Sequence, residues 1–577
     1  MKNRIHIFSY ISFIIIVLLT SCTQKIESKE QVQEDFDQYT NTFFIEEIRE
    51  NTLNLHYTLA YPENYGIDNY PITFGEFGSE AFEDGFFELQ EYIEVLETFS
   101  YGALTKEQQL TYDILLDYMK TELNAKDLYK YTEILGPTLG YQTQLPILLA
   151  EYTFRREADV KDYLKLLEQL DKFYEDIIEF QRDKSAAGLF MSDYIADEII
   201  LQCETFIENP ESNYLIELFD QRIDGLSNLT PESKESYKKK NRTIVKNDVV
   251  NAYEILINGL TTLKGTGRNN GGLSNYDNGK EYYEYLVKTS TGSSKSVSRL
   301  QELTDDFIMK NINDMYTILV INPDLYNELD SYAFHLTDPN EILDDLSNKM
   351  SKDFPPLINT NYTVKYVHES LEKNLSPAFY LTPPIDDMSE NVIYINGKYD
   401  TDDIYTTLAH EGYPGHLYQT LYTTSTGLPL IRNLLSYSGY VEGWATYVEY
   451  YSYNLSGLNH DLAQLLKFNS AASLGLYAYI DMGVNYDGWD LNDVTNYLYD
   501  YGIEDEGMIE EIFYAMVEAP ANYLCYFIGY LEILELKDFA ETSMNEDFSL
   551  IEFHDSLLSI GPAPFYIIKD YLLEEMN

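Results

Sequence analysis

The 577-residue sequence is poor in cysteine and in basic side chains. Its three cysteines are too few for the disulfide framework that stabilises small secreted proteins. Its 39 Lys and Arg residues are outnumbered by 96 Asp and Glu residues, which gives a formal charge of −57 at pH 7. Because binding to nucleic acid depends on clustered cations, this charge excludes nucleic acid as a partner. The same charge favours cations or basic peptides as ligands.

Long apolar runs are missing after residue 22, so the sequence predicts no membrane-spanning segment in the rest of the chain. Apolar residues nevertheless make up 45% of the chain, with 54 Tyr and 28 Phe. That content supplies enough apolar area for packed cores and excludes an intrinsically disordered protein. The length exceeds the roughly 250–300 residues at which a single core stops growing. We therefore expect two or more structural units, or one large helical enzyme domain.

The first 22 residues resemble a bacterial lipoprotein signal peptide. A positively charged start precedes an apolar run over about residues 11–19, which is shorter than the roughly 20 residues that a bilayer-spanning helix needs. The run ends in LTSC, which resembles a lipobox whose cysteine is lipidated and becomes the first mature residue. We predict a lipid anchor on Cys22, a polar tether over residues 23–32 and a location outside the cytoplasm, on the membrane. The alternative is an uncleaved transmembrane helix.

Beyond the tether, apolar residues recur at helical spacing along most of the chain, which predicts a mostly α fold. Two segments rich in β-branched and aromatic residues, 362–367 and 391–395, predict a few short strands. The clearest helical segments are 87–123, 160–181, 191–207, 245–263 and 297–315.

A Gly- and Asn-rich stretch over residues 265–278 interrupts the helical pattern. It lacks the Gly-Lys-Ser/Thr ending of a phosphate-binding loop and follows no predicted strand, so we interpret it as a connection. We accordingly divide the chain into an N-terminal helical region (33–264), a connection (265–294) and a C-terminal helical catalytic region (295–577).

Two of the eight histidines lie six residues apart in the sequence LAHEGYPGHLYQ, and a glutamate follows the first. We expect a helix, capped by Thr401 or Asp402, to carry His410 and Glu411 at its end. The pair resembles half of the HExxH zinc motif, in which two histidines four residues apart bind one zinc ion and the glutamate polarises water. Here the second histidine is His416.

A spacing of six residues requires a deformed helix. Six residues turn an unbroken helix through about 600°, which would leave His416 about 120° away from His410. Pro414 removes a backbone donor and Gly415 tolerates unusual dihedral angles, so the sequence predicts a bulge or kink between the histidines. Both histidines can then face one metal ion.

A third ligand is expected on a second predicted helix over about residues 430–453. Glu442, in the sequence YVEGWATYVE, is the best candidate. Glu449 lies seven residues further along the same helix face, where it is expected to orient the ligands. The alternative at this spacing is a pair of solvated or helix-capping histidines. The paired helices favour the metal site.

Five segments follow one another in a recognisable order: LAHEGYPGHLYQ, YVEGWATYVE, IDMGVNYDGW, VEAPANYLCYFIGYLEI and FHDSLLSIGPAPF. They resemble successive landmarks of the bacterial family known as domain of unknown function 885 (DUF885), over about residues 40–570. Members resemble helical zinc peptidases of the gluzincin kind. The resemblance implies a large, mostly α, zincin-like metallohydrolase that uses zinc.

Three positions depart from the pattern of this family. Asn485 replaces the histidine of a DxGxH segment, Tyr477 stands where many members have arginine, and Asn522 departs from a segment usually read as PGQxxxY. None of them is a proposed ligand, but they concern how a substrate carboxylate or oxyanion is held. Tyr526, the tyrosine of that last segment, is retained, and we expect its phenol to face the tetrahedral intermediate.

Two further residues are candidates for contacts with the substrate. His554 is expected behind Tyr526, and for both the alternative is a core residue. Arg432 is expected either to bind a substrate carboxylate or to form a surface ion pair.

The sequence therefore predicts a zinc-dependent peptide hydrolase. His410, His416 and Glu442 are expected to hold the metal, and Glu411 to accept the proton of the attacking water. One alternative is a lipid-anchored protein that binds peptides or metal without turnover, and another is a metal-free structural lipoprotein. Glu411 favours the enzyme, because a binding protein needs no carboxylate beside a ligand.

Overall fold

The computed structural model describes residues 28–576 except 330, 358–360, 370–371, 373–374, 400–403 and 436. The predicted signal peptide, Cys22 and the first part of the tether lie outside the described residues, as do Thr401 and Asp402. No helix in the described part of the chain is both long and apolar enough to cross a membrane. The two other cysteines, Cys203 and Cys525, are buried.

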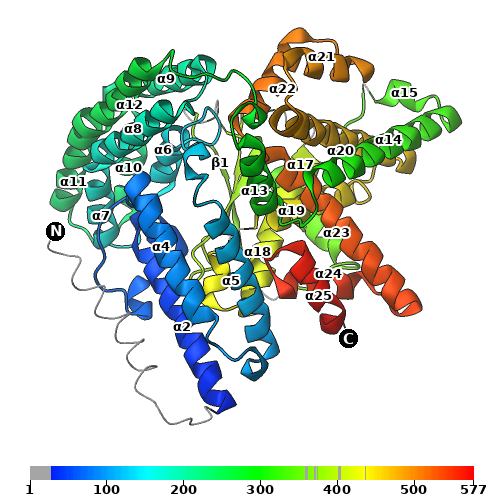
Figure 1. Ribbon diagram of the computed structural model, residues 1–577, viewed down its shortest axis with the longest axis horizontal. Helices are drawn as coiled ribbons and strands as arrows, with labels where there is room; N and C mark the ends of the chain where they lie inside the picture. The colour runs from blue at the N-terminus through cyan, green and yellow to red at the C-terminus, as the bar shows by residue number, and fades with distance from the viewer. Residues whose placement is uncertain are drawn as a thin grey trace.

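The fold is mostly α-helical, as the sequence predicts, with one small sheet (Figure 1). The helices before the Gly- and Asn-rich stretch are α2 (Lys29–Arg49), α3 (Thr52–Thr58), α4 (Ser79–Leu96), α5 (Lys106–Asn124), α6 (Tyr141–Glu151), α7 (Glu157–Leu167), α8 (Leu170–Ala187), α9 (Asp193–Ile207), α10 (Tyr214–Gly225), α11 (Pro231–Ile244) and α12 (Val250–Leu263). The helices after it are α13 (Gly279–Thr291), α14 (Val297–Ile321), α15 (Leu325–Glu328), α16 (Pro339–Met350), α17 (Ile404–Glu411), α18 (His416–Ser425), α19 (Ser438–Ser452), α20 (His460–Met482), α21 (Leu491–Asp500), α22 (Glu506–Glu518), α23 (Asn522–Met544), α24 (Leu550–Ile560) and α25 (Phe565–Glu575).

The structure corrects several predicted boundaries, two of them at helix N-caps. α2 begins at Lys29, inside the predicted tether, because the Ser28 side chain accepts a hydrogen bond from the Gln31 backbone N–H. A capping box at Thr105 starts α5, so the predicted helical segment 87–123 contains two helices. The predicted connection 265–294 is also too long, since α13 occupies most of its second half.

The sheet has three strands in the order β1-β3-β2. β1 (Thr363–Tyr366) pairs in parallel with β3 (Val392–Ile395), and β2 (Ala378–Leu381) pairs antiparallel with β3. β1 and β3 confirm the two predicted extended segments, whereas β2 was not predicted. β2 forms an edge of the sheet and lies against α17, which carries the first histidine of the site.

Two large hydrophobic cores meet at the sheet. One contains residues of α2 to α5 together with residues of α16 to α20 and α23 to α25, and the other contains mainly residues of α6 to α12. The central strand contributes to both, because Ile393 and Ile395 belong to the first core and Val392 and Tyr394 to the second. The first helices of the chain are therefore part of the core of its C-terminal half.

Candidate metal centre

His410 and His416 flank a break between two helices, as the sequence predicts. α17 ends at Glu411 and α18 begins at His416, with Gly415 as its N-cap. A Cβ atom on Gly415 would lie 1.7 Å from the carbonyl oxygen of His410. Only glycine therefore allows the chain to fold back so closely that α18 starts beside the end of α17.

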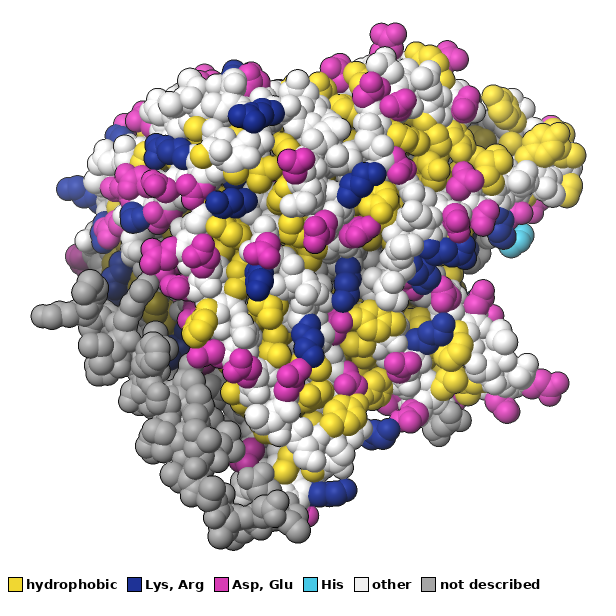
Figure 2. Space-filling model, in the orientation of Figure 1, with side chains coloured by type: hydrophobic (Ala, Val, Ile, Leu, Met, Phe, Trp, Pro, Cys, Tyr) yellow, Lys and Arg dark blue, Asp and Glu magenta, His cyan; other side chains and the backbone are white. Residues whose placement is uncertain are grey.

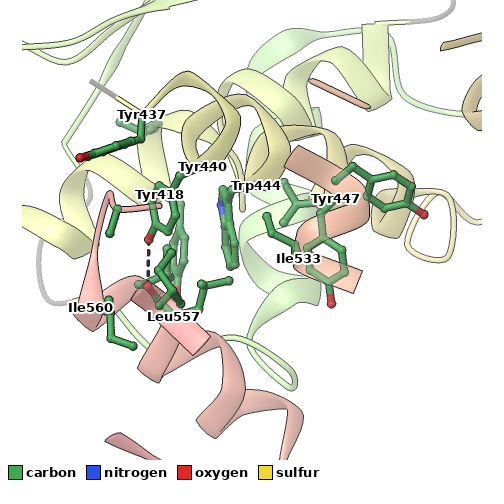
Figure 3. Close-up of a cluster of buried hydrophobic side chains, with 14 of the residues drawn as sticks. Tyr418, Tyr437, Tyr440, Trp444, Tyr447, Ile533, Leu557 and Ile560 are labelled. Atoms are coloured by element: carbon green, nitrogen blue, oxygen red, sulfur yellow. Dashed lines mark hydrogen bonds between the residues drawn. The ribbon is translucent and has the colours of Figure 1, made fainter. Parts of the chain in front are cut away.

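α19 holds this break from the other side. The indole Nε1 of Trp444 donates a hydrogen bond of 2.9 Å to the carbonyl oxygen of Pro414. Trp444 is fully buried, and it points from α19 into a cluster with Tyr440 and Leu557 (Figure 3). The predicted second helix is shorter than expected, because residues 430–433 form a separate 3₁₀ turn and α19 begins at Ser438.

Two imidazole nitrogens and one carboxylate oxygen converge at the site. Oε2 of Glu442 lies 3.5 Å from Nε2 of His410 and 3.4 Å from Nε2 of His416. The centroids of the two imidazole rings are 4.8 Å apart. The side chains of His410, His416 and Glu442 are 12%, 14% and 23% exposed, so the site is sheltered but open to solvent. This donor set fits a zinc ion that keeps one position for water or substrate.

Glu411 stands beside the ligand set. Its carboxylate and the nitrogens of both histidines lie within 4.8 Å of one another. Among the described residues Glu411 forms no ion pair with either histidine, whereas Glu442 lies within ion-pair distance of both. Oε2 of Glu411 instead accepts the backbone N–H of Tyr380, on β2, at 2.9 Å. The edge strand therefore orients a carboxylate that is near the histidines without being held by them.

The charges of the site are strongly coupled. Burial alone would raise the pKa of the Glu442 carboxyl, but hydrogen bonds with His410 and His416 hold this pKa well below its usual value. Burial opposes the charge of His410, yet Glu442 and Glu449 raise its pKa well above the usual value. Burial raises the pKa of Glu411. The Glu411 carboxyl therefore binds a proton more readily than an exposed glutamate does.

Tyr526, on α23, lies next to the histidines. Its ring centroid is 6.3 Å from that of His410, and the two rings are inclined by 26°. Burial raises the pKa of Tyr526, so its phenol keeps its proton and can donate a hydrogen bond. The structure therefore brings Glu411, Glu449 and Tyr526 together with the three predicted metal ligands.

One family of bacterial proteins matches most of this chain. The family described as bacterial protein of unknown function (DUF885) matches residues 73–572. The chain belongs to the DUF885 family. Among curated proteins, none matches the chain.

Two solved structures show that other bacterial proteins share the fold. A candidate lipoprotein from Colwellia psychrerythraea is 20% identical, with a TM-score of 0.81 over 96% of this chain and 99% of that chain. A candidate lipoprotein of unknown function from Shewanella oneidensis is 14% identical, with a TM-score of 0.64 over 95% of this chain and 100% of that chain.

His554 lies in the hydrophobic core of this DUF885 protein. It is 0% exposed, its Nε2 lies 3.0 Å from the hydroxyl of Tyr447, and its ring stacks on Phe354. Burial lowers the pKa of His554 to about 4, which keeps the imidazole neutral. These contacts match the alternative of a core residue.

Arg432 is also buried, so the predicted surface ion pair is wrong. It is 1% exposed, and its Nη2 donates hydrogen bonds to the carbonyl oxygens of Ile560 and Pro562 at 2.8 and 3.0 Å. No carboxylate pairs with it in the part of the chain that the structure describes. Burial lowers the pKa of Arg432 to about 10. Its guanidinium stabilises the turn after α24.

The three departures from the DUF885 pattern lie outside the donor set. Asn485 is fully buried and links the Gly- and Asn-rich stretch to α22, by accepting the N–H of Leu273 and donating to the carbonyl of Met516. Tyr477 packs against Tyr523, with ring centroids 5.0 Å apart. Asn522 is the first residue of α23.

Sequence reasoning missed two residues that shape this centre, Tyr380 and Trp444. Tyr380 acts through a backbone amide on a strand of four residues, which leaves almost no pattern in a sequence. Trp444 had a detectable signal, since it is one of two tryptophans in the chain and lies two residues after Glu442. On a helix that spacing places it on the face opposite the ligand, towards the core.

Proposed function

We propose that this DUF885 protein is a zinc-dependent peptide hydrolase. The observation that supports the proposal is the convergence of His410, His416 and Glu442 beside an additional carboxylate, Glu411. When bound, a zinc ion would supply a Lewis acid that polarises a substrate carbonyl and lowers the pKa of water.

The remaining steps belong to side chains of the protein. Glu411 accepts a proton from the attacking water on its carboxylate and passes it to the leaving amine, and the pKa raised by burial suits it to both tasks. The backbone N–H of Tyr380 keeps this carboxylate in place. The phenol of Tyr526 donates a hydrogen bond to the substrate oxygen on which negative charge develops.

Charge supports a neutral or basic peptide as the substrate. The chain has a formal charge of −57, and in Figure 2 magenta carboxylate side chains are scattered over the described part of the face shown, among dark-blue basic ones. Among the described residues, no Lys or Arg forms an ion pair with Glu411, Glu442 or Glu449. A basic peptide is attracted to such a surface, whereas a polyanion is repelled.

The alternative is a lipoprotein that binds peptides or metal without turnover. A non-catalytic site has no use for a carboxylate that is oriented beside the ligands and carries a raised pKa. Glu411 therefore favours the enzyme.

We also propose that the protein is anchored outside the cytoplasmic membrane by a lipid on Cys22. The signal-like first 22 residues support this location, and two proteins that share the fold are described as candidate lipoproteins. Cys22→Ala should remove the lipid, which labelling with a radioactive fatty acid detects. Lipid attached to that variant would contradict the proposal.

The function is tested by incubating the zinc-loaded protein, prepared without residues 1–22, with a diverse peptide mixture. Mass spectrometry identifies any cleaved bonds, and His416→Ala treated in the same way is the control. Cleavage by the parent alone supports the hydrolase. Bound zinc without cleavage supports the binding protein, and failure to bind zinc supports a structural role.

A further inference from the structure

Helix α23, which carries Tyr526, starts from a turn that is unfavourable for its sequence. Ala521, the N-cap residue, has φ 65° and ψ 7°, in the left-handed region that residues with a Cβ atom rarely adopt. No side chain of the helix caps its first turn. A contact from elsewhere in the molecule must therefore stabilise this turn.

The carboxylate of Asp481 supplies that contact. Its Oδ1 and Oδ2 accept the backbone N–H of Ala521 at 3.1 and 3.0 Å. Asp481 lies in the last turn of α20 and is 0% exposed. The hydroxyl of Tyr283 donates to Oδ1 at 2.6 Å, and Nδ2 of Asn485 donates at 3.2 Å. No Lys or Arg pairs with Asp481 in the described part of the chain, so these three donors alone stabilise a buried carboxylate.

The rest of α23 is fixed by its packing against α19, the helix that carries Glu442 and Glu449. The two helices touch through backbone at glycines, since a Cβ atom on Gly529 would lie 2.0 Å from the carbonyl oxygen of Gly439. Such a contact sets the distance between the two helices along their middle. The bonds from Asp481 to Ala521 fix the backbone at the start of α23, five residues before Tyr526.

We propose that Asp481 is a positioning residue for Tyr526. It holds the turn at Ala521, the turn fixes the start of α23, and α23 presents the phenol of Tyr526 beside His410. The inference rests on the proposed function only because it gives Tyr526 a role at the metal centre.

A double-mutant cycle tests this coupling in the zinc-loaded mature protein. Asp481→Asn and Tyr526→Phe should each lower kcat about 10- to 100-fold with KM and zinc content unchanged, because a misplaced catalytic group costs about this much. The double variant should be no slower than Tyr526→Phe alone. If Asp481→Asn slows the Tyr526→Phe protein by the same factor as it slows the parent, the inference is overturned.

Two further variants separate positioning from general damage. Asp487→Asn changes an exposed aspartate six residues further along the chain and should leave kcat unaltered. Ala521→Gly, added to Asp481→Asn, should restore part of the lost rate, because glycine adopts the left-handed conformation freely. If Asp481→Asn does not fold, Tyr283→Phe removes one donor from the same carboxylate and replaces it in the cycle.

Hydrogen exchange tests the same contact without turnover, so it separates failure of this inference from failure of the proposed function. Asp481→Asn should speed exchange of the amides of residues 521–526 about 10-fold and leave those of residues 442–449 as in the parent. Unchanged exchange at residues 521–526 would overturn the inference. Faster exchange there in a protein that cleaves no peptide would support the contact and reject the hydrolase.

Discussion

Nδ1 of His410 lies 3.0 Å from Oε2 of Glu449, while Nε2 of the same ring faces Glu442 at 3.5 Å. A proton held on Nδ1 by Glu449 leaves Nε2 free as a metal ligand, so the two glutamates on one face of α19 have different tasks. In the proposed zinc site, Glu442 is the third ligand, and Glu449 fixes the orientation and tautomer of His410.

Glu449→Gln should therefore weaken zinc binding about 10- to 100-fold without abolishing it, the usual cost of losing a carboxylate behind a ligating histidine. Glu442→Gln should lose most of its zinc, since it removes a ligand. Competition with a chromophoric chelator measures both affinities. Equal losses in the two variants would contradict the assignment of separate tasks.

Glu411→Gln should lower hydrolysis at least ~100-fold, because glutamine keeps the size of the side chain but cannot accept the proton of water. Zinc content and KM should stay close to those of the parent. Single-turnover kinetics on a peptide identified in the cleavage screen, with metal analysis of the same sample, measure these quantities. A variant as active as the parent would remove Glu411 from the mechanism.

Gly415→Ala should weaken zinc binding at least ~10-fold and lower the free energy of unfolding by about 1–3 kcal/mol. The added Cβ atom would lie 1.7 Å from the carbonyl oxygen of His410, so the backbone between the two histidines must move. Gly85→Ala is the matched control, because a Cβ atom there meets nothing within 4 Å, and alanine should stabilise α4 slightly. Zinc titration and thermal unfolding compare the two. Parental zinc affinity in Gly415→Ala would show that the close approach is not needed.

Ionic strength should separate substrates by their charge. For two peptides with the same cleaved bond, one flanked by lysines and one by glutamates, kcat/KM at low salt should favour the lysine peptide about 10-fold. Salt near 0.5 M should remove most of this difference, because it screens exposed charges. A preference that does not respond to salt would place specificity in direct contacts instead of the surface charge.

Asp481 should make stability depend on pH between about 4 and 7. Burial raises the pKa of Asp481 from 3.8 to about 7, and the phenol of its neighbour Tyr283, whose pKa is also raised by burial, stays neutral. Over this range the folded protein binds a proton that the unfolded chain releases, so the free energy of unfolding should fall as pH rises, by at most ~1.4 kcal/mol per pH unit. In Asp481→Asn this slope should be smaller. Urea unfolding at several pH values measures it, and identical slopes would contradict the assignment.

Short-range patterns in the sequence predicted which side chains would come together at the candidate metal centre. Pro414 and Gly415 signalled the break between α17 and α18, because proline and glycine affect the backbone where they stand. The spacing of Glu442 and Glu449 followed from the geometry of one helix. In each case the residues that decide the outcome are neighbours in the sequence.

Features that depend on distant residues were not predicted. Arg432 is buried because its guanidinium reaches carbonyl groups of residues 560 and 562, a contact that no local pattern encodes. β2, with the sequence AFYL, is as long as the two predicted strands but has no β-branched residue, and its pairing with β3 joins it to the sheet. The early start of α2 is a local feature that was also not predicted: the Gln31 backbone N–H donates a hydrogen bond to the Ser28 side chain.

The core that α2 to α5 share with α16 to α20 and α23 to α25 limits how the chain can be divided into fragments. A fragment that begins near residue 295 would contain every proposed metal ligand but would expose the surface that Phe44 and Met119 cover in the complete protein. Such a piece should aggregate when expressed alone. The N-terminal helices complete this core, so domain swaps and truncation libraries of this protein need to retain them.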